Sequence, residues 1–179
     1  RDLLAERAEI IRDEIKDAGR ASIAFNELAE LGGDDTVLNS VVKSQIQLGD
    51  FAAAEATYKK MENDAADDAA KCRILIQLAA LQLNNMKNIS AAESTLYRAR
   101  QLAPDSREVI AAMSDVQISK GDFAGAVKSL EEQIEIAEGS KARAEIYTRM
   151  GLIAIDNIED VEKATSYFEH AIELDSSNL

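Results

Sequence analysis

The sequence predicts an all-α protein built from antiparallel helix hairpins, and three observations support this fold class. The six residues from Gly49 to Ala54 recur from Gly121 to Ala126 with five identities, and a helical pattern flanks each copy. Apolar residues make up 46% of the chain but aromatic residues only 4%, so small and aliphatic side chains must fill the core. A single proline among 179 residues also favours helices over a turn-rich sheet.

The recurring six residues have the features of a turn between two helices. Glycine tolerates the left-handed backbone that ends a first helix, and aspartate can accept hydrogen bonds at the start of a second helix. The phenylalanine is expected to fill the bend. Ala54 and Ala126 then fall where only a small side chain lets the two helices approach closely.

The first two helices are expected before residue 34. Helical spacing of apolar residues predicts a helix over 1–18, with one stripe on its inner face. That stripe consists of Leu4, Ala8, Ile11 and Ile15. Gly19 is expected to end this helix, and a second helix then runs to Leu31. Gly32 and Gly33 are expected to stop it, with Asp34 or Asp35 as the cap of the next helix.

Helices three to five are expected between Gly33 and Asn84. Helix three runs to Leu48, with four residues facing inward: Leu38, Val41, Val42 and Gln45. The first Gly-Asp-Phe turn leads into helix four. Residues 63–70 are rich in alanine and aspartate, and because alanine favours helix we expect helix five to extend back through them from a cap at Asp64.

Capping patterns place the remaining helices. Ser90 to Glu93 and Asp105 to Glu108 both read as capping boxes, which start helices six and seven on either side of Pro104. Helix eight follows the second Gly-Asp-Phe turn. Gly139-Ser140 separates it from helix nine, and helix ten is expected over 160–174. Ten helices in five hairpins is the predicted organisation.

A small residue recurs after each predicted turn. These residues are Ala24, Ala54, Ala92, Ala126 and Ala164, at spacings of 30, 38, 34 and 38 residues. Four positions beyond each stands a larger apolar residue: Leu28, Tyr58, Leu96, Leu130 and Phe168. A period near 34 residues in a helix-turn-helix unit indicates a solenoid, in which each hairpin buries its apolar stripe against the next.

At these residues the chain resembles the tetratricopeptide repeat (TPR) family, whose pattern is W-x2-L-G-x2-Y, A-x3-F and P. The last hairpin matches as Tyr147-x2-Met150-Gly151-x2-Ala154 and Ala164-x3-Phe168, with Ser176 at the proline position. The third matches as Ile76-x2-Ala79-Ala80-x2-Leu83 and Ala92-x3-Leu96, with Pro104. The resemblance implies one right-handed α-solenoid domain over 1–179. Its hairpins are expected over 2–32, 34–63, 65–103, 105–138 and 140–175.

Bulk composition narrows the classes of partner and compartment. A formal charge of −13 disfavours nucleic acid and anionic membrane surfaces as partners, and favours either simple solubility or steering of a basic partner. One cysteine, Cys72, excludes an intrachain disulfide, and it is expected to be a small buried residue. No signal peptide or membrane span is predicted, so the default compartment is the cytoplasm. Because the chain starts at Arg1 without methionine and lacks a polar terminal cap helix, we expect it to be a piece of a longer protein.

No pattern predicts catalysis, a cofactor or a metal. His170 is the only histidine, and no nucleophile shares a motif with it, so we expect a surface or interhelix role. Asp64-x2-Asp67-Asp68 could suggest a Mg²⁺-diphosphate site, but such a site needs a deep lined pocket, and capping explains these residues better. We therefore predict a protein that is not an enzyme.

The TPR resemblance implies a concave groove lined by the first helix of each hairpin, which holds a peptide or helix of a partner protein. The residues that would face it are Asn39, Lys43, Gln77, Leu81, Asp115, Thr148 and Leu152. Some family members clamp a C-terminal carboxylate, but Leu78, Glu108 and Ala112 stand where donors would be needed, so no such clamp is predicted. The predicted function is a protein-binding scaffold. The alternative is a structural module that forms homo-oligomers through the exposed apolar ends of the array.

Overall fold

The protein is all-helical, as the sequence predicts. The computed structural model describes residues 2–11, 13, 17–32 and 35–175, and within these ranges it contains no β-strand. Helices α1 to α5 span Asp2–Ile10, Ala18–Leu31, Asp35–Gln47, Phe51–Asp64 and Asp68–Asn84. Helices α6 to α9 span Ile89–Leu102, Arg107–Lys120, Phe123–Ile136 and Ser140–Ile153. A π-helical turn, η2, spans Ala154–Ile158, and α10 spans Val161–Leu174.

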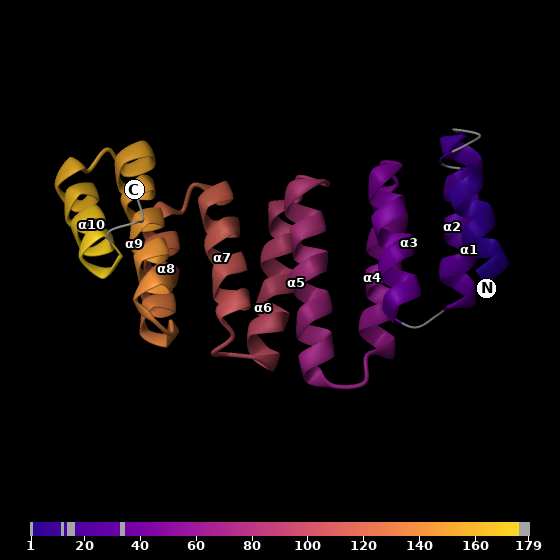
Figure 1. Cartoon of the computed structure of the whole chain (residues 1–179), viewed down its shortest axis with the longest axis horizontal. Coiled ribbons are helices and arrows are strands. Elements are labelled where there is room, and N and C mark those ends of the chain that lie inside the picture. Colours follow the sequence, from indigo (N-terminus) through magenta and orange to yellow (C-terminus); the bar gives the residue numbers. More distant parts are fainter. Residues whose placement is uncertain (1, 12, 14–16, 33–34, 176–179) are drawn as a thin grey trace. The chain divides into compact units, whose positions relative to one another are not determined.

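The chain divides into two compact units, residues 1–88 and 89–179. In the first unit, α1 packs on α2, α3 on α4, and α2 on α3 (Figure 1). In the second unit, α7 packs on α8, α9 on α10, and α8 on α9. Four of the five predicted hairpins thus have paired helices. Helix α5 belongs to the first unit and α6 to the second, so the hairpin predicted over 65–103 stays a prediction.

Both Gly-Asp-Phe turns have the predicted geometry. Gly49 and Gly121 adopt φ angles of 76° and 79°, which L-residues with a side chain rarely adopt. Asp50 accepts a hydrogen bond from the backbone N–H of Ala53 at 3.2 Å, and Asp122 accepts one from Gly125 at 3.0 Å. The phenylalanine that follows each aspartate is half-buried against the local core. In the turn motif, glycine therefore ends one helix, aspartate caps the next, and phenylalanine packs against the core at the bend.

The recurring alanines are buried, as the spacing predicts. Ala54, Ala92 and Ala126 are fully buried, and Ala24 and Ala164 are nearly so. The apolar residues four positions beyond them are buried as well, except that Phe168 is only half-buried. Phe168 lies over Gly151 of α9, where an added Cβ would come within 2.5 Å of its ring. Glycine at position 151 therefore lets α10 pack tightly against α9.

A buried polar pair repeats with the turns. In the first unit, the Thr57 hydroxyl of α4 donates to Oε1 of Gln45 on α3 at 3.0 Å, and both side chains are buried. In the second unit, the side chains of Ser129 on α8 and Gln117 on α7 are hydrogen-bonded at 2.8 Å. The two pairs are 72 residues apart, like the turns. Gln45, Thr57 and Ser129 are buried, whereas Gln117 is half-buried. Because a buried polar group is costly unless it is paired, each pair favours one register of its two helices.

Several boundaries differ from the sequence prediction. Helix α4 continues through Asp64, and α5 begins after Asp67, which accepts from Ala70 N–H; the expected cap at Asp64 is wrong. Asp67 is the cap of α5 because its backbone is extended, which lets its carboxylate accept a hydrogen bond from the first turn of the helix. Gly19 lies inside the first turn of α2, which Asp17 caps, rather than ending α1.

Capping also differs slightly in the second unit. Helix α6 begins at Ile89, so Ser90 lies within its first turn instead of preceding it. Ser106, not Asp105, caps α7 by accepting from Val109 N–H. Of the residues used in the sequence predictions, Ile15, Gly33, Asp34 and Ser176 lie outside the described part of the chain.

A first prediction concerns the alanine contact at the second turn. Ala126→Leu should lower the free energy of unfolding by about 1–3 kcal/mol, because the fully buried site has no room for three more carbon atoms. Urea unfolding followed by circular dichroism measures this loss. Ala124→Leu on the same helix is the matched control, since Ala124 is exposed. Equal effects of the two substitutions would contradict the close-contact interpretation.

A second prediction concerns acid stability of the first unit. The Ser22 hydroxyl donates to the Asp50 carboxylate, and this hydrogen bond, with that from Ala53 N–H, lowers the pKa of Asp50 below 3.8. A carboxyl whose pKa is lower in the folded state stabilises the fold above its unfolded-state pKa, and this stabilisation is lost as the pH falls through its folded pKa. Ser22→Ala should therefore lower the free energy of unfolding at neutral pH and flatten its decline below about pH 4.

Urea unfolding across this pH range tests the prediction. The control is Ser119→Ala, which removes a hydroxyl that donates to the backbone carbonyl of Asp115. A decline on acidification that is unchanged by Ser22→Ala would show that this hydrogen bond does not carry the pH dependence.

Candidate functional site

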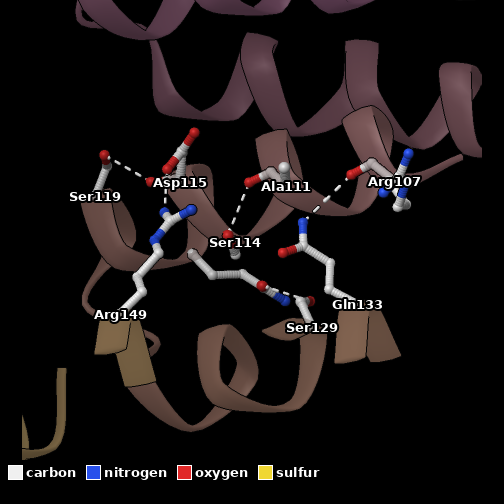
Figure 2. A network of polar contacts seen from close by, with 9 residues as sticks. Arg107, Ala111, Ser114, Asp115, Ser119, Ser129, Gln133 and Arg149 are labelled. Atoms are coloured by element: carbon white, nitrogen blue, oxygen red, sulfur yellow. Dashed lines mark hydrogen bonds and ion pairs between the residues drawn. The ribbon is translucent and has the colours of Figure 1, made fainter. Parts of the chain in front are cut away.

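A groove in the second unit is the candidate functional site, and we call it the α7–α9 groove. It is an open hollow of about 370 Å³ between the first helices of the last two hairpins, with α8 behind them. Its lining consists of Arg107, Glu108 and Ala111 from α7, Gln133 and Ala137 from the end of α8, and Ala142, Glu145, Ile146 and Arg149 from α9. Figure 2 shows the polar contacts around it.

Gln133 forms the polar part of the back wall. Its side chain is 7% exposed, and Nε2 donates to the backbone carbonyl of Arg107 across the α7–α8 pair at 3.3 Å (Figure 2). This contact holds the amide in one orientation next to the groove. The hollow exists because alanine occupies positions 111, 137 and 142, where larger side chains would fill it.

An ion pair connects the two walls of the groove. Arg149 of α9 donates through its guanidinium to the Asp115 carboxylate of α7 (Figure 2). Both side chains are partly exposed, at 32% and 54%, so solvent weakens the attraction and the pair can be remodelled at small cost. The Arg143 side chain also donates to the backbone carbonyl of Ala137, which fixes the turn from α8 into α9.

The charges along the groove are mixed. Glu108 accepts hydrogen bonds from its own backbone N–H and from the Ser106 hydroxyl, and these bonds lower its pKa below the usual 4.5. Glu108 is therefore ionised at neutral pH. With Glu145 and Asp115 it places three carboxylates beside two arginines, so the groove can hold both a basic side chain and the carbonyl oxygens of a polypeptide.

The three predicted groove residues of the second unit lie outside the lining of this groove. Asp115 lies one turn beyond Ala111 and contacts the groove residue Arg149. Thr148 is half-buried, and its hydroxyl donates to the Ala144 carbonyl within α9. Leu152 is exposed farther along α9. Of the three, only Asp115 contacts a residue of the groove lining through its side chain.

The four predicted residues of the first unit are less uniform. Asn39 and Lys43 lie on the exposed face of α3, and the Asn39 amide donates to the Asp35 carbonyl of the same helix. Gln77 is exposed on α5. Leu81 is only 2% exposed and packs in a core cluster with Leu38 and Val42. Leu81 is therefore a core residue, because helix packing turned its side chain inward, and it is not available to a ligand.

The sequence prediction missed most of the groove lining. Glu145 and Arg149 lie on the same face of α9 as Thr148 and Leu152, so helical spacing could have found them. Gln133 lies on a second helix, which the rule of first helices excludes. Arg107 is the first residue of α7, directly after the capping serine. The sequence prediction used this segment only to place the start of the helix and did not consider it as part of the groove.

A second hollow, of about 430 Å³, lies in the first unit. It is lined by residues of α2 and α4 and by Gln45 of α3. Alanines 29, 53 and 56 form its walls. Lys60 closes one side by donating to the backbone carbonyls of Ala29 and Glu30 at the end of α2. The polar contacts at this hollow connect the helices of the unit to each other, which is a structural role.

The described part of the chain offers no arrangement for metal chemistry. Within it, no three histidine, cysteine or acidic side chains gather as metal ligands. His170 is exposed, and its ring stacks on Tyr147 with centroids 5.1 Å apart, which places it between α9 and α10. Cys72 is buried. None of the described helices is both long enough and apolar enough to cross a bilayer.

Comparison with known proteins confirms the resemblance to the tetratricopeptide repeat family. The family model of the tetratricopeptide repeat matches residues 144–178, which include most of α9 and all of α10. Among curated proteins, none matches this chain. TPR repeats are protein-interaction modules and are generally not enzymes.

Solved structures of TPR proteins match nearly the whole chain. A crystal structure of MamA matches with 20% identity over 93% of each chain and a TM-score of 0.64. MamA from Desulfovibrio magneticus RS-1 matches with 15% identity over 98% of this chain and 95% of its own, with a TM-score of 0.65. YrrB, described as a TPR protein with an unusual peptide-binding site, matches with 15% identity over 97% of this chain and 85% of its own, with a TM-score of 0.61. At these identities the matches establish the fold, and they confirm the predicted all-α, TPR-like fold class.

A third prediction concerns the ion pair across the groove. A double-mutant cycle with Asp115→Ala and Arg149→Ala should give a coupling energy of roughly 0.2–1 kcal/mol, because both side chains are partly solvated. Urea unfolding of the four proteins measures it, and added salt should reduce it. A coupling energy above about 2 kcal/mol would mean that the ion pair holds α7 and α9 together firmly and cannot be broken by a ligand at small cost.

Proposed function

We propose that this chain is a protein-interaction scaffold whose α7–α9 groove binds an extended segment of a partner protein. The observation that carries the proposal is the lining of the groove: an alanine-walled hollow with Gln133 at its back wall and Arg149, Glu108 and Glu145 at its edges. Alternating apolar and polar contacts of this kind suit the side chains and the backbone of a peptide.

The form of the hollow supports a peptide over a metabolite. It is open along two helices and has room for a few side chains, whereas a small-molecule site encloses most of its ligand. The Gln133 amide and the Arg149 guanidinium can hydrogen-bond the carbonyl oxygens of an extended backbone. Ile146 offers an apolar contact between them.

Charge points to a basic residue in the bound segment. Glu108 and Glu145 are exposed carboxylates that line the groove beside Arg107 and Arg149, and the hydrogen bonds that lower the pKa of Glu108 keep it ionised. The formal charge of −13 on the whole chain would also attract a basic segment from a distance. The peptide-binding site described for YrrB, a protein of the same fold, supports this class of ligand.

We propose that the exposed side chains of Asn39, Lys43 and Gln77 in the first unit also contact a partner protein. Leu81 is excluded because it is buried. Substituting Leu81 would therefore report on stability, whereas substituting the three polar residues would report on binding.

A fourth prediction tests the groove directly. Peptides are selected from a random library on the immobilised 179-residue chain, and their affinities are measured by fluorescence anisotropy. Glu145→Lys should weaken the selected peptides by about tenfold or more and reduce the salt dependence of binding, because it replaces a groove carboxylate by an ammonium group while Glu108 remains. Glu135→Lys makes the same charge change on the exposed face of α8, outside the groove, and should have little effect.

Circular dichroism confirms that both variants keep their helices. If Glu145→Lys and Glu135→Lys weaken the selected peptides equally, or if neither does, the peptides bind elsewhere and the α7–α9 groove is not the site.

A further inference from the structure

The Gln133 side chain has one hydrogen-bonding atom that the α7–α8 contact leaves unused. The residue is 7% exposed, and its Nε2 donates to the Arg107 carbonyl. Because a carbonyl oxygen can only accept, this contact fixes the amide with its nitrogen toward Arg107 and its oxygen turned away, as Figure 2 shows. Among the described residues, the Gln133 side chain makes no second hydrogen bond, so its Oε1 is an unused acceptor.

This unused oxygen can be reached from the α7–α9 groove. No enclosed side-chain nitrogen or oxygen of the described residues lacks a hydrogen-bond partner, so the unpartnered Oε1 must be open to solvent. Gln133 lines the back wall of the groove, and a donor can approach its oxygen from there. A ligand that filled the groove without donating to Oε1 would leave a buried acceptor unsatisfied, which costs binding free energy. The groove therefore requires a donor at its back wall.

The fold itself does not require an amide at this position. Position 133 corresponds to position 61, because the two Gly-Asp-Phe turns and the two polar pairs are each 72 residues apart. Met61 occupies that position and is buried in the apolar cluster of the first unit. An unbranched apolar side chain of similar length thus serves the same place in the hairpin. The amide of Gln133 is a feature of the hairpin that forms the groove.

The back wall of the groove favours a cationic donor. Gln133 lies in the last turn of α8 and Ala137 is the C-cap residue, so this wall lies at the negative end of the helix dipole. The Arg143 side chain binds at the same helix end by donating to the Ala137 carbonyl at 3.1 Å. This contact shows, within the chain itself, that a guanidinium group fits the end of α8.

The edges of the groove carry one negative charge in excess. Glu108 and Glu145 line the groove together with Arg107 and Arg149, and these four charges cancel. Arg149, however, is already paired with the carboxylate of Asp115, so three carboxylates stand beside two arginines. One positive charge on a bound side chain would balance the groove.

We infer that the groove selects an arginine of the bound segment, and that Gln133 distinguishes this arginine from a lysine. The inference rests on the proposed function, because it concerns the same groove. The aliphatic part of the arginine packs on the groove alanines and Ile146, its guanidinium donates to Oε1 of Gln133, and its other N–H groups remain for Glu145. Lysine carries all its donors on one strongly hydrated nitrogen, so it cannot serve the back wall and the edge together.

The fifth prediction is an arginine requirement that depends on Gln133. The peptides selected on the 179-residue chain should share an arginine. Replacing that arginine by lysine should weaken binding about tenfold or more, because charge-assisted hydrogen bonds are lost. Gln133→Met should weaken the arginine peptide by a similar factor and the lysine peptide much less, since lysine makes no full use of Oε1. Fluorescence anisotropy measures the four affinities.

Two controls accompany the Gln133→Met variant, which introduces the residue found at position 61. Circular dichroism and urea unfolding measure its helix content and stability. Gln101→Met makes the same substitution at an exposed position of α6, outside the groove, and should leave every affinity unchanged. If Gln133 only held α7 against α8, Gln133→Met would weaken the arginine and lysine peptides by the same factor, and this result would overturn the inference. The comparison of the two peptides on the unchanged chain does not depend on the variant.

The outcomes separate this inference from the proposed function. Selected peptides that lack a shared arginine, or that bind equally well with lysine in its place, would overturn the inference. If Glu145→Lys still weakens such peptides, the α7–α9 groove remains the binding site. Peptides that neither Glu145→Lys nor Gln133→Met weakens bind elsewhere on the chain, and that result would overturn both.

Discussion

The structure depends on how closely the two helices of a hairpin approach at the turn. Ala54 and Ala126 are fully buried directly after the Gly-Asp-Phe turns, so a larger side chain there would have to displace its neighbours. The positive φ angles of Gly49 and Gly121 bring the chain into this contact, and the following aspartates cap the second helices. The hairpin is thus a unit in which turn, cap and close packing each require the others.

The groove is a consequence of this packing rather than an addition to it. The close α7–α8 contact and the Ser129–Gln117 pair fix the α8 register, and that register places Gln133 at the back wall, against the Arg107 carbonyl. The alanines of α7, α8 and α9 then leave a hollow. Charged residues lie at its edges because they start helices or lie on their solvent faces, where their charge costs little.

The charge of the groove lining is mixed, since two glutamates and two arginines line it. The chain as a whole carries a formal charge of −13, and this field attracts basic segments from a distance. The same net charge would direct a basic partner to the groove.

The sequence by itself determined the helices, the turns and the alanine contacts, because these follow from local chemistry: glycine at positive φ, aspartate at a helix start, and small residues at a regular spacing. Only the tertiary structure decided which residues are buried and which line the groove. Leu81 has the spacing of a groove residue but lies in the core, and Gln133 lies on a second helix yet forms the back wall of the groove. The physical reason is that a residue's exposure depends on the helix that packs against it, and one helix's sequence does not specify its neighbour's position.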